Sequence, residues 1–259
     1  MKTETWTQAA RHQYELGRLL PLGGSEDGTW ITEQAAVRAL RGAVTGIPDA
    51  RLDSVRIGAA PLEPVSEPAV RPPVGALPPG PLRMEAAFTA SLGRPLPQTA
   101  EQVRSALLRA ATEELGLAVV TADLSVTDLD EGPETIVRPP IARKAMRPQR
   151  EATAGLSSPM TATGPTGTLA GVAAAVPGVA RLTTVPGGRP ITVKHEGDPP
   201  GLRIEVQIAV VPGHHPLEVA RAVRAAVAEA AASATPGPVT AAVVITETAL
   251  RPAGDKRQP

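Results

Sequence analysis

The chain contains no cysteine, so it can form neither a disulfide framework nor a thiolate metal site, and it has no cysteine nucleophile. Aromatic side chains make up only 2% of the 259 residues, and acidic and basic residues balance at 26 each. This balance argues against a protein whose net charge recruits nucleic acid or an anionic membrane. The core must be filled mainly by Val, Ile, Leu and Ala. Because alanine buries little area, we expect moderate stability.

Long apolar runs are also missing. No stretch approaches the roughly 18 apolar residues of a membrane-spanning helix, and the N-terminal residues lack the apolar block of a signal peptide. We therefore expect a cytoplasmic protein that does not span a membrane. The excess of arginine over lysine, together with much Ala, Gly and Pro, indicates a GC-rich coding genome such as an actinobacterium's.

Two similar segments show what the chain does contain. Residues 82–92 read LRMEAAFTASL and residues 202–211 read LRIEVQIAVV, 120 positions apart. Each alternates apolar and polar side chains, as a half-buried strand does, and each leads into an amphipathic helix and a further strand. The closing strands match at an offset of 121, which places Ala122 on Val243 and Leu124 on Ile245. We interpret the chain as an internal duplication.

Each unit is expected to run helix, strand, strand, helix, strand. This order predicts an α/β fold of the α+β type, with a small, mainly antiparallel sheet and helices on one face. The first unit opens with a helix over Ile31–Val44, after a loop at Pro21–Gly28. Pro61–Pro81 holds eight prolines and is expected to be an exposed, extended loop. The expected organisation is an N-terminal helical extension (1–28, with a helix at Thr5–Gly17), repeat one (29–129), a flexible linker (130–167), repeat two (168–250) and a disordered tail (251–259).

The second unit carries a family resemblance. Gly201–Leu250, with LEVARAVRAAVAEA between two strands, resembles the alkaline shock protein family, the general-stress envelope proteins of Gram-positive bacteria. EELGLAVVTADLSVTDL in the first unit and Ala-Val-Pro-Gly-Val at 175–179 are similar to patterns of the same family. The resemblance implies small α/β domains without enzymatic activity, which self-associate and are held beneath the cytoplasmic membrane by a separate membrane protein.

Candidate catalytic groups are few. His214 and His215 precede the second main helix and could hold a metal or transfer a proton, but adjacent histidines diverge and no His-x-x-x-His pattern completes a zinc set. The acidic cluster that includes Asp123 and Asp128 lacks the spacing and central glycine of a calcium loop. We expect no catalytic, cofactor-binding or metal site, and no cofactor.

Two groups of residues are candidates for interaction. Arg83 and Glu85 recur as Arg203 and Glu205 on the polar faces of the two long strands, where they would form a solvated sheet face or a polar contact between the repeats. The linker holds the one concentrated basic stretch, which would contact nucleic acid or acidic lipid headgroups or act as a solubilising linker: Arg138, Arg143, Lys144, Arg147 and Arg150. No aromatic side chains interleave it for base stacking, so we favour the linker interpretation.

The leading hypothesis is a non-enzymatic structural or scaffold protein of the envelope-stress type. It would act by self-association or by docking to a membrane-bound partner, in the cytoplasm or at the membrane periphery through that partner. The alternative is a nucleic-acid-binding module that uses the basic linker and the sheet surfaces. Nucleic acid is the less favoured partner, because the chain lacks the Gly-x-x-Gly loop and the aromatic platform of such modules. An enzyme acting through the histidine pair is a third, weaker interpretation.

Overall fold

A computed structural model describes residues 18–61, 67–130, 165–184, 189–196, 201–235 and 237–248. Over these residues the α+β class is confirmed, because helices pack on two sheets that each contain parallel and antiparallel pairs. The predicted N-terminal helix at 5–17, residues 131–164 of the predicted linker and the tail lie outside the described residues. The two ends of the predicted linker (130–167) are regular structure instead, because residue 130 ends a strand and residues 165–167 begin a helix.

The first half forms a three-stranded sheet under two helices. Its strand order is β3-β4-β5, with β3 antiparallel to β4 and β4 parallel to β5. The helix between β4 and β5 ends in a π-helical segment, η1, whose last residue precedes Gly116 in the left-handed conformation (φ 86°). The elements are α2 (Glu33–Val44), β3 (Ala50–Ala59), β4 (Leu82–Ser91), α3 (Leu96–Arg109), η1 (Ala110–Leu115) and β5 (Val119–Asp130).

The second half has a similar arrangement, with two short strands in the place of β3. Strands β6 and β7 are both antiparallel to β8, and β8 is parallel to β9. The predicted mainly antiparallel sheet is therefore corrected to a mixed sheet, since in each half a helix crosses over between two parallel strands. The duplication itself stays a prediction. The elements are α4 (Pro165–Ala174), β6 (Val179–Leu182), β7 (Ile191–Glu196), β8 (Gly201–Val210), α5 (Pro216–Ala232) and β9 (Val239–Glu247).

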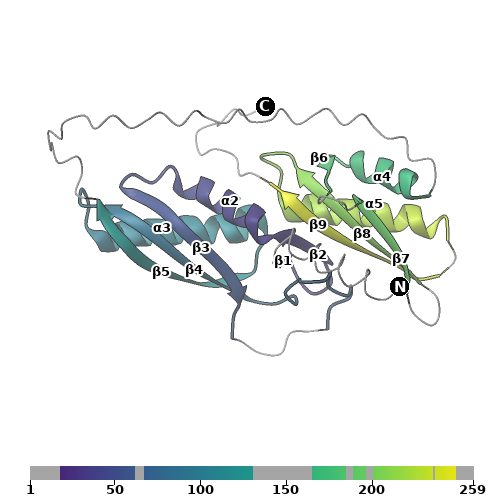
Figure 1. The fold of residues 1–259 in the computed structure, drawn as a ribbon, viewed down its shortest axis with the longest axis horizontal. Coiled ribbons are helices and arrows are strands. Elements are labelled where there is room, and N and C mark those ends of the chain that lie inside the picture. Colours follow the sequence, from purple (N-terminus) through teal and green to yellow (C-terminus); the bar gives the residue numbers. More distant parts are fainter. Residues whose placement is uncertain are drawn as a thin grey trace, which may run out of the picture.

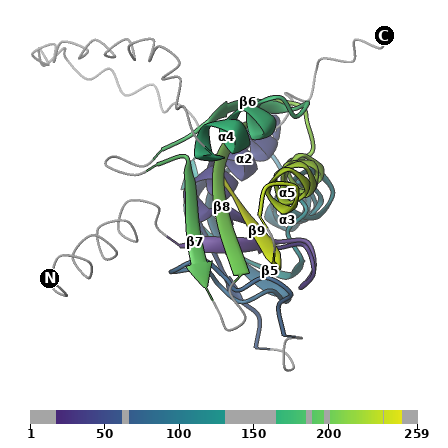
Figure 2. The same cartoon turned by 90° about the vertical axis from the view of Figure 1, so that its right-hand side faces the viewer.

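The two halves lie side by side along the long axis of the molecule, with the helices on one face of both sheets (Figure 1). Seen along that axis, α3 overlaps α5 and α2 overlaps α4, so the layers of the two halves are in line (Figure 2). The predicted placement of helices on one face agrees with this arrangement. The opposite face of each sheet is left for other contacts.

The N-terminal region departs from the prediction. Leu19–Leu22 and Thr29–Thr32 form strands β1 and β2 of an antiparallel hairpin, where we expected a loop and the first turn of a helix. Strand β2 pairs in parallel with β9, which extends the second sheet to β1-β2-β9-β8-β6, with β7 also on β8. Helix α2 begins only at Glu33, because the hydroxyl of Thr32 caps it by accepting from the Ala35 N–H. Strands of four residues are too short to show a period, and their partner lies far along the chain.

One hydrophobic cluster runs beneath the helices through both halves, with Met84 and Phe88 from β4 and Ile204 and Ile208 from β8. A second, small cluster lies on the other face of the second sheet, where Val70 packs with Trp30 and Val244. Val70 is 2% exposed, so part of the proline-rich segment covers the sheet instead of forming the wholly exposed loop that we expected.

The register of the closing strands also differs from the sequence alignment. Ala86 lies opposite Leu124, whereas Val206, its counterpart 120 positions on, lies opposite Val243. Leu124 therefore corresponds to Val243 in space, not to Ile245. The register shift between Leu82 and Arg83 adds a residue to β5 near its start. A slip of two residues keeps every side chain on its own face, so the alternating pattern could not reveal it.

Hydrogen bonds join the N-terminal hairpin to both halves. The Gly23 N–H donates to the carbonyl of Gly116 at 3.0 Å, beyond the end of η1. In the same loop, Asp27 accepts from Nε and a terminal nitrogen of Arg221 on α5, at 2.7 and 3.0 Å, and from the Gly24 N–H at 2.7 Å. The hairpin thus fixes how the first half meets the second.

Candidate functional site

The uncovered face of the β3-β4-β5 sheet carries the first pair of predicted interaction residues. Arg83 lies 2.8 Å from a carboxylate oxygen of Asp123 on β5 and 3.1 Å from one of Glu85 on its own strand. All three side chains are about half exposed, at 43%, 52% and 57%. A shallow hollow of about 300 Å³ lies among them, with Ser54 and Ser125 in its lining. A shallow polar surface of this kind suits reversible contact with another polar surface.

A second polar group crosses the same face at the β-bulge of β3. Asp53 accepts hydrogen bonds from the hydroxyls of Thr127 at 2.7 Å and Thr89 at 2.8 Å, and Arg51 lies 3.0 Å away. The Thr127 and Thr89 hydroxyls, followed by the charge of Arg51, hold the pKa of Asp53 below its ordinary value. The three strands are thereby linked side chain to side chain, so this face is rigid and polar.

The second predicted pair has a different role. Arg203 donates to the carbonyls of Arg71 at 2.9 Å and Pro72 at 3.2 Å, so it holds the proline-rich loop against the second sheet. Glu205 is half-buried, opposite Thr192 of β7. The structure places Arg83 and Arg203 in separate sheets and does not bring the two pairs together. Equivalent positions on β4 and β8 therefore face solvent in one half and a loop in the other.

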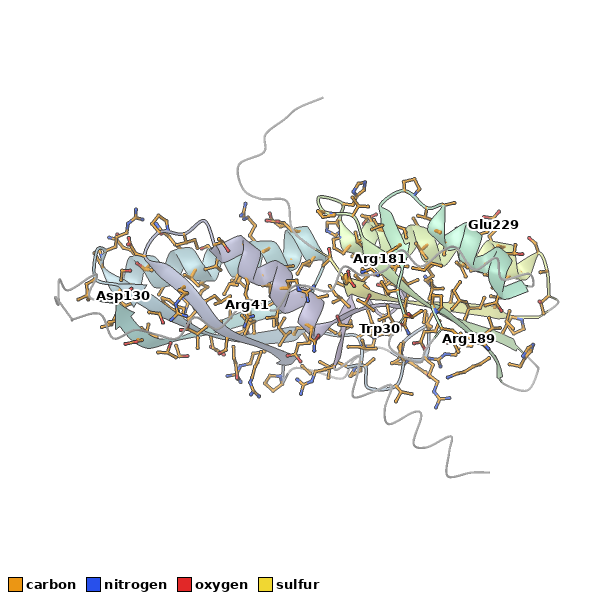
Figure 3. The ribbon with its side chains drawn as sticks, turned by 45° about the horizontal axis from the view of Figure 1, so that its top comes forward. Trp30, Arg41, Asp130, Arg181, Arg189 and Glu229 are labelled. Carbon is orange, nitrogen blue, oxygen red and sulfur yellow. The ribbon has the colours of Figure 1, made fainter. Side chains whose placement is uncertain are left out.

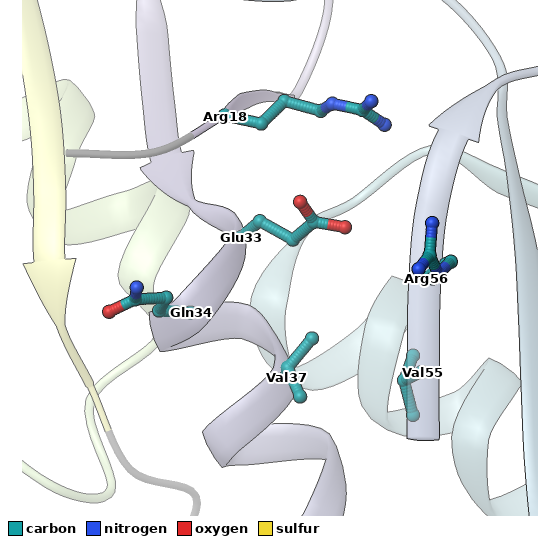
Figure 4. Close-up of a pocket in the computed structure, with 6 residues that line it drawn as sticks. All are labelled: Arg18, Glu33, Gln34, Val37, Val55 and Arg56. Carbon is teal, nitrogen blue, oxygen red and sulfur yellow. The ribbon is translucent and has the colours of Figure 1, made fainter. Parts of the chain in front are cut away.

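The outer edge of β3 is occupied by side chains. The Ile57 N–H donates to Glu33 at 3.3 Å and the Ile57 carbonyl accepts from Arg18 at 3.2 Å, while Arg41 donates to the Asp53 carbonyl at 3.3 Å. Figure 4 shows Arg18 and Glu33 around the hollow of about 370 Å³ at this edge. Since these polar groups already bond the backbone of β3, this hollow is the consequence of a capped edge and not a ligand site.

The outer edge of β5 is open by contrast. The Leu82 N–H donates to the Ala118 carbonyl at 2.8 Å, so the even-numbered residues of β4 bond toward β5. In the β4–β5 register beyond the first bulge, the backbone N–H and C=O groups of Asp123 and Ser125 then point toward β4. Those of Ala122, Leu124 and Val126 therefore point away from the sheet. Two side chains of the described residues meet this edge: Arg104 donates to the Ala122 carbonyl at 3.3 Å, and near the end of the strand Asp128 accepts from the Leu129 N–H at 2.9 Å. This open edge was not predicted, because it depends on where the β1–β2 hairpin binds.

The corresponding edge of the second sheet is covered by the chain's own β2. The Val243 N–H donates to the Gly28 carbonyl at 3.1 Å, and Thr29, Trp30 and Ile31 pair in parallel with Val243, Val244 and Ile245. By the structural register, these three β9 residues are the counterparts of Leu124, Ser125 and Val126. The same edge is thus closed in one half and open in the other.

The remaining predicted residues do not form a site here. His215 caps α5 beside Gly116, and its Nδ1 is buried without a hydrogen-bond partner in the described residues. No group of three His, Asp or Glu that could hold a metal is found among the residues that the structure describes. A larger hollow of about 850 Å³, lined in part by Ile47 and Gln98, is wide open to solvent. The five basic linker residues lie outside the described residues.

No protein-family model, curated protein or solved structure matches this chain. The resemblance to alkaline shock proteins therefore stays a prediction. In the described part of the chain, no helix is long and apolar enough to cross a membrane.

Proposed function

We propose that this chain is a non-enzymatic scaffold protein that works by associating with other copies of itself through the open edge of β5. The observation that carries the proposal is the difference between the two sheets: β2 closes the edge of β9, and no described strand closes the equivalent edge of β5. Unpaired N–H and C=O groups on a strand edge are a template for another strand.

Exposed apolar side chains are spread along the same strand and beside its end. Val120 is 53% exposed, Val126 38% and Leu129 45%, and Leu92 at the end of β4 is 58% exposed. The described residues contain only two other exposed large apolar side chains, Val74 and Leu96. Asp130 marks the end of β5 at one extremity of the molecule, far from Trp30 in the second sheet (Figure 3). The described residues of the second sheet therefore lie away from this end of the edge.

Sedimentation of the full chain over a range of concentrations tests the proposal. We expect the mass to rise from one chain toward two as concentration rises, because pairing an exposed edge is a weak, reversible contact. A single-chain mass up to the highest soluble concentration would overturn it. Docking to a membrane-anchored partner, which the family resemblance implies, is favoured by no described contact and stays a prediction.

A proline at an outward-facing position gives a matched pair of variants. Val126→Pro removes an N–H that points away from β4, so the sheet keeps its ladder and the association is lost. Ser125→Pro removes an N–H that points toward β4, so it destabilises the fold itself. Circular dichroism separates the two results, since only Val126→Pro should keep the native spectrum while sedimenting as a monomer.

A further inference from the structure

We infer that two copies pair β5 with β5 in an antiparallel sense, about a two-fold axis at Leu124 or Ser125. The inference rests on the proposed function and names the partner at the same edge. A two-fold axis closes the assembly at two chains, because each copy offers the same edge to the other.

The backbone supplies the hydrogen bonds for this pairing. Leu124 and Val126 direct their N–H and C=O groups outward, and a two-fold axis at Ser125 places Leu124 of each copy opposite Val126 of the other. An axis at Leu124 places Leu124 opposite itself and Ala122 opposite Val126. Residues that face each other with outward groups exchange both backbone bonds in an antiparallel ladder. The Arg104 side chain would leave the Ala122 carbonyl in the second case.

Charge repulsion between aspartates of β5 disfavours some of the possible pairing registers. An axis at Asp123 or Asp128 would put an aspartate directly opposite the same aspartate of the other copy, and like charges in that position are destabilising. With the axis at Leu124, Asp123 faces Ser125, and with the axis at Ser125 it faces Thr127. Both favoured registers also keep polar side chains on the polar face, since Asp123, Ser125 and Thr127 share it.

In the second half of the chain, the equivalent stretch of β9 already has a partner strand. Val243, Val244 and Ile245 are the residues that β2 covers, and they are the spatial counterparts of Leu124, Ser125 and Val126. The proposed axis thus falls on the same three-residue stretch that is already paired within the chain. Two differences remain: β2 pairs with β9 in parallel and comes from the same chain, whereas the proposed partner of β5 is antiparallel and comes from a second copy.

Cysteine cross-linking tests the geometry separately from the association. The natural chain has no cysteine, so Ser125→Cys carries a single thiol. Across the proposed axis the two Cβ atoms are about 5 Å apart if Ser125 lies on the axis and about 7–8 Å apart if Leu124 does. A short bismaleimide spans both distances. Ser105→Cys, exposed on α3, is the control because Ser105 lines the hollow between α3 and the end of α2, on the side of α3 away from the edge of β5.

We expect Ser125→Cys to give a covalent dimer at concentrations where sedimentation shows association, and Ser105→Cys to give much less. A dimer by sedimentation without cross-linking at position 125 would overturn this inference and leave the proposed function standing. A monomer under all conditions would overturn both. Cross-linking of position 125 to a different protein in a cell extract, with no homodimer, would also overturn the inference.

Discussion

Asp27→Asn removes the charge from the contact that ties the N-terminal hairpin to α5, and we expect a clear loss of stability. The Asp27 side chain is 10% exposed and accepts three hydrogen bonds, two of them from the Arg221 guanidinium. Hydrogen bonds that involve a charged group stabilise by about 1.5–3 kcal/mol. Because the Arg221 side chain is 45% exposed and can be rehydrated, we expect the low end, about 1–2 kcal/mol in the free energy of unfolding.

The same variant should change the dependence of stability on pH. The hydrogen bond from Arg221 is the largest cause that holds the pKa of Asp27 below its ordinary value. Since the folded state then binds fewer protons than the unfolded chain, this stabilisation is fully present above the unfolded pKa of about 4 and is lost as pH falls below it. Asp27→Asn should therefore lose more stability at pH 7 than at pH 3.

Urea unfolding followed by circular dichroism measures both effects. The matched control is Asp123→Asn, because Asp123 also accepts from an arginine at 2.8 Å but is 52% exposed. An exposed pair of this kind is worth less than about 1 kcal/mol, so the control should shift the midpoint little. Equal losses for the two variants, or an Asp27→Asn loss that does not depend on pH, would refute the argument that burial makes the Asp27 contact important.

Three further predictions concern the core, a tight turn and the proline-rich loop. Phe88→Ala should lower the free energy of unfolding by about 3–5 kcal/mol in urea titrations because Phe88 is 0% exposed, and an equal effect from Val120→Ala, at 53% exposure, would contradict this reasoning. Gly116→Ala should cost about 2–4 kcal/mol, because φ is 86° and a Cβ would lie 2.8 Å from Cβ of Leu217. Gly46→Ala meets no atom and should be near neutral, and urea titrations measure both glycine variants. Arg203→Met should speed hydrogen exchange in the proline-rich loop, measured at the Ala69 and Leu77 amides, because Arg203 bonds the loop to the second sheet. The free energy of global unfolding should fall by less than about 1 kcal/mol. Unchanged exchange would show that Arg203 does not hold the loop.

Much of the regular structure could be predicted because its periods are long and clear. The strict alternation of Leu82–Leu92 predicted β4 to within one residue, and the amphipathic helices expected after the two long strands are α3 and α5. Strands β1 and β2 were missed because four residues show no period.

The candidate site was predicted only in part. Placing Arg83 and Glu85 on the polar face of a strand was correct, since both are exposed on the face of β4 away from the helices. Their partner Asp123 was seen only as part of an acidic cluster, because its distance from Arg83 depends on the register between β4 and β5. That the edge of β5 is open could not be predicted, since it depends on where the β1–β2 hairpin binds.

The sequence by itself determined the local periods: which residues form the long strands and helices, and which face of each is apolar. Only the tertiary structure decided that β2 pairs with β9, that Leu124 and not Ala122 corresponds to Val243, and that Arg203 holds a loop while Arg83 faces solvent. The physical reason is that alternation has a period of two residues. If the pairing of two strands shifts by two residues, every side chain stays on the same face, so the alternating pattern cannot tell the two registers apart. Bulges and long-range backbone hydrogen bonds remove that ambiguity, and they exist only once the chain has folded.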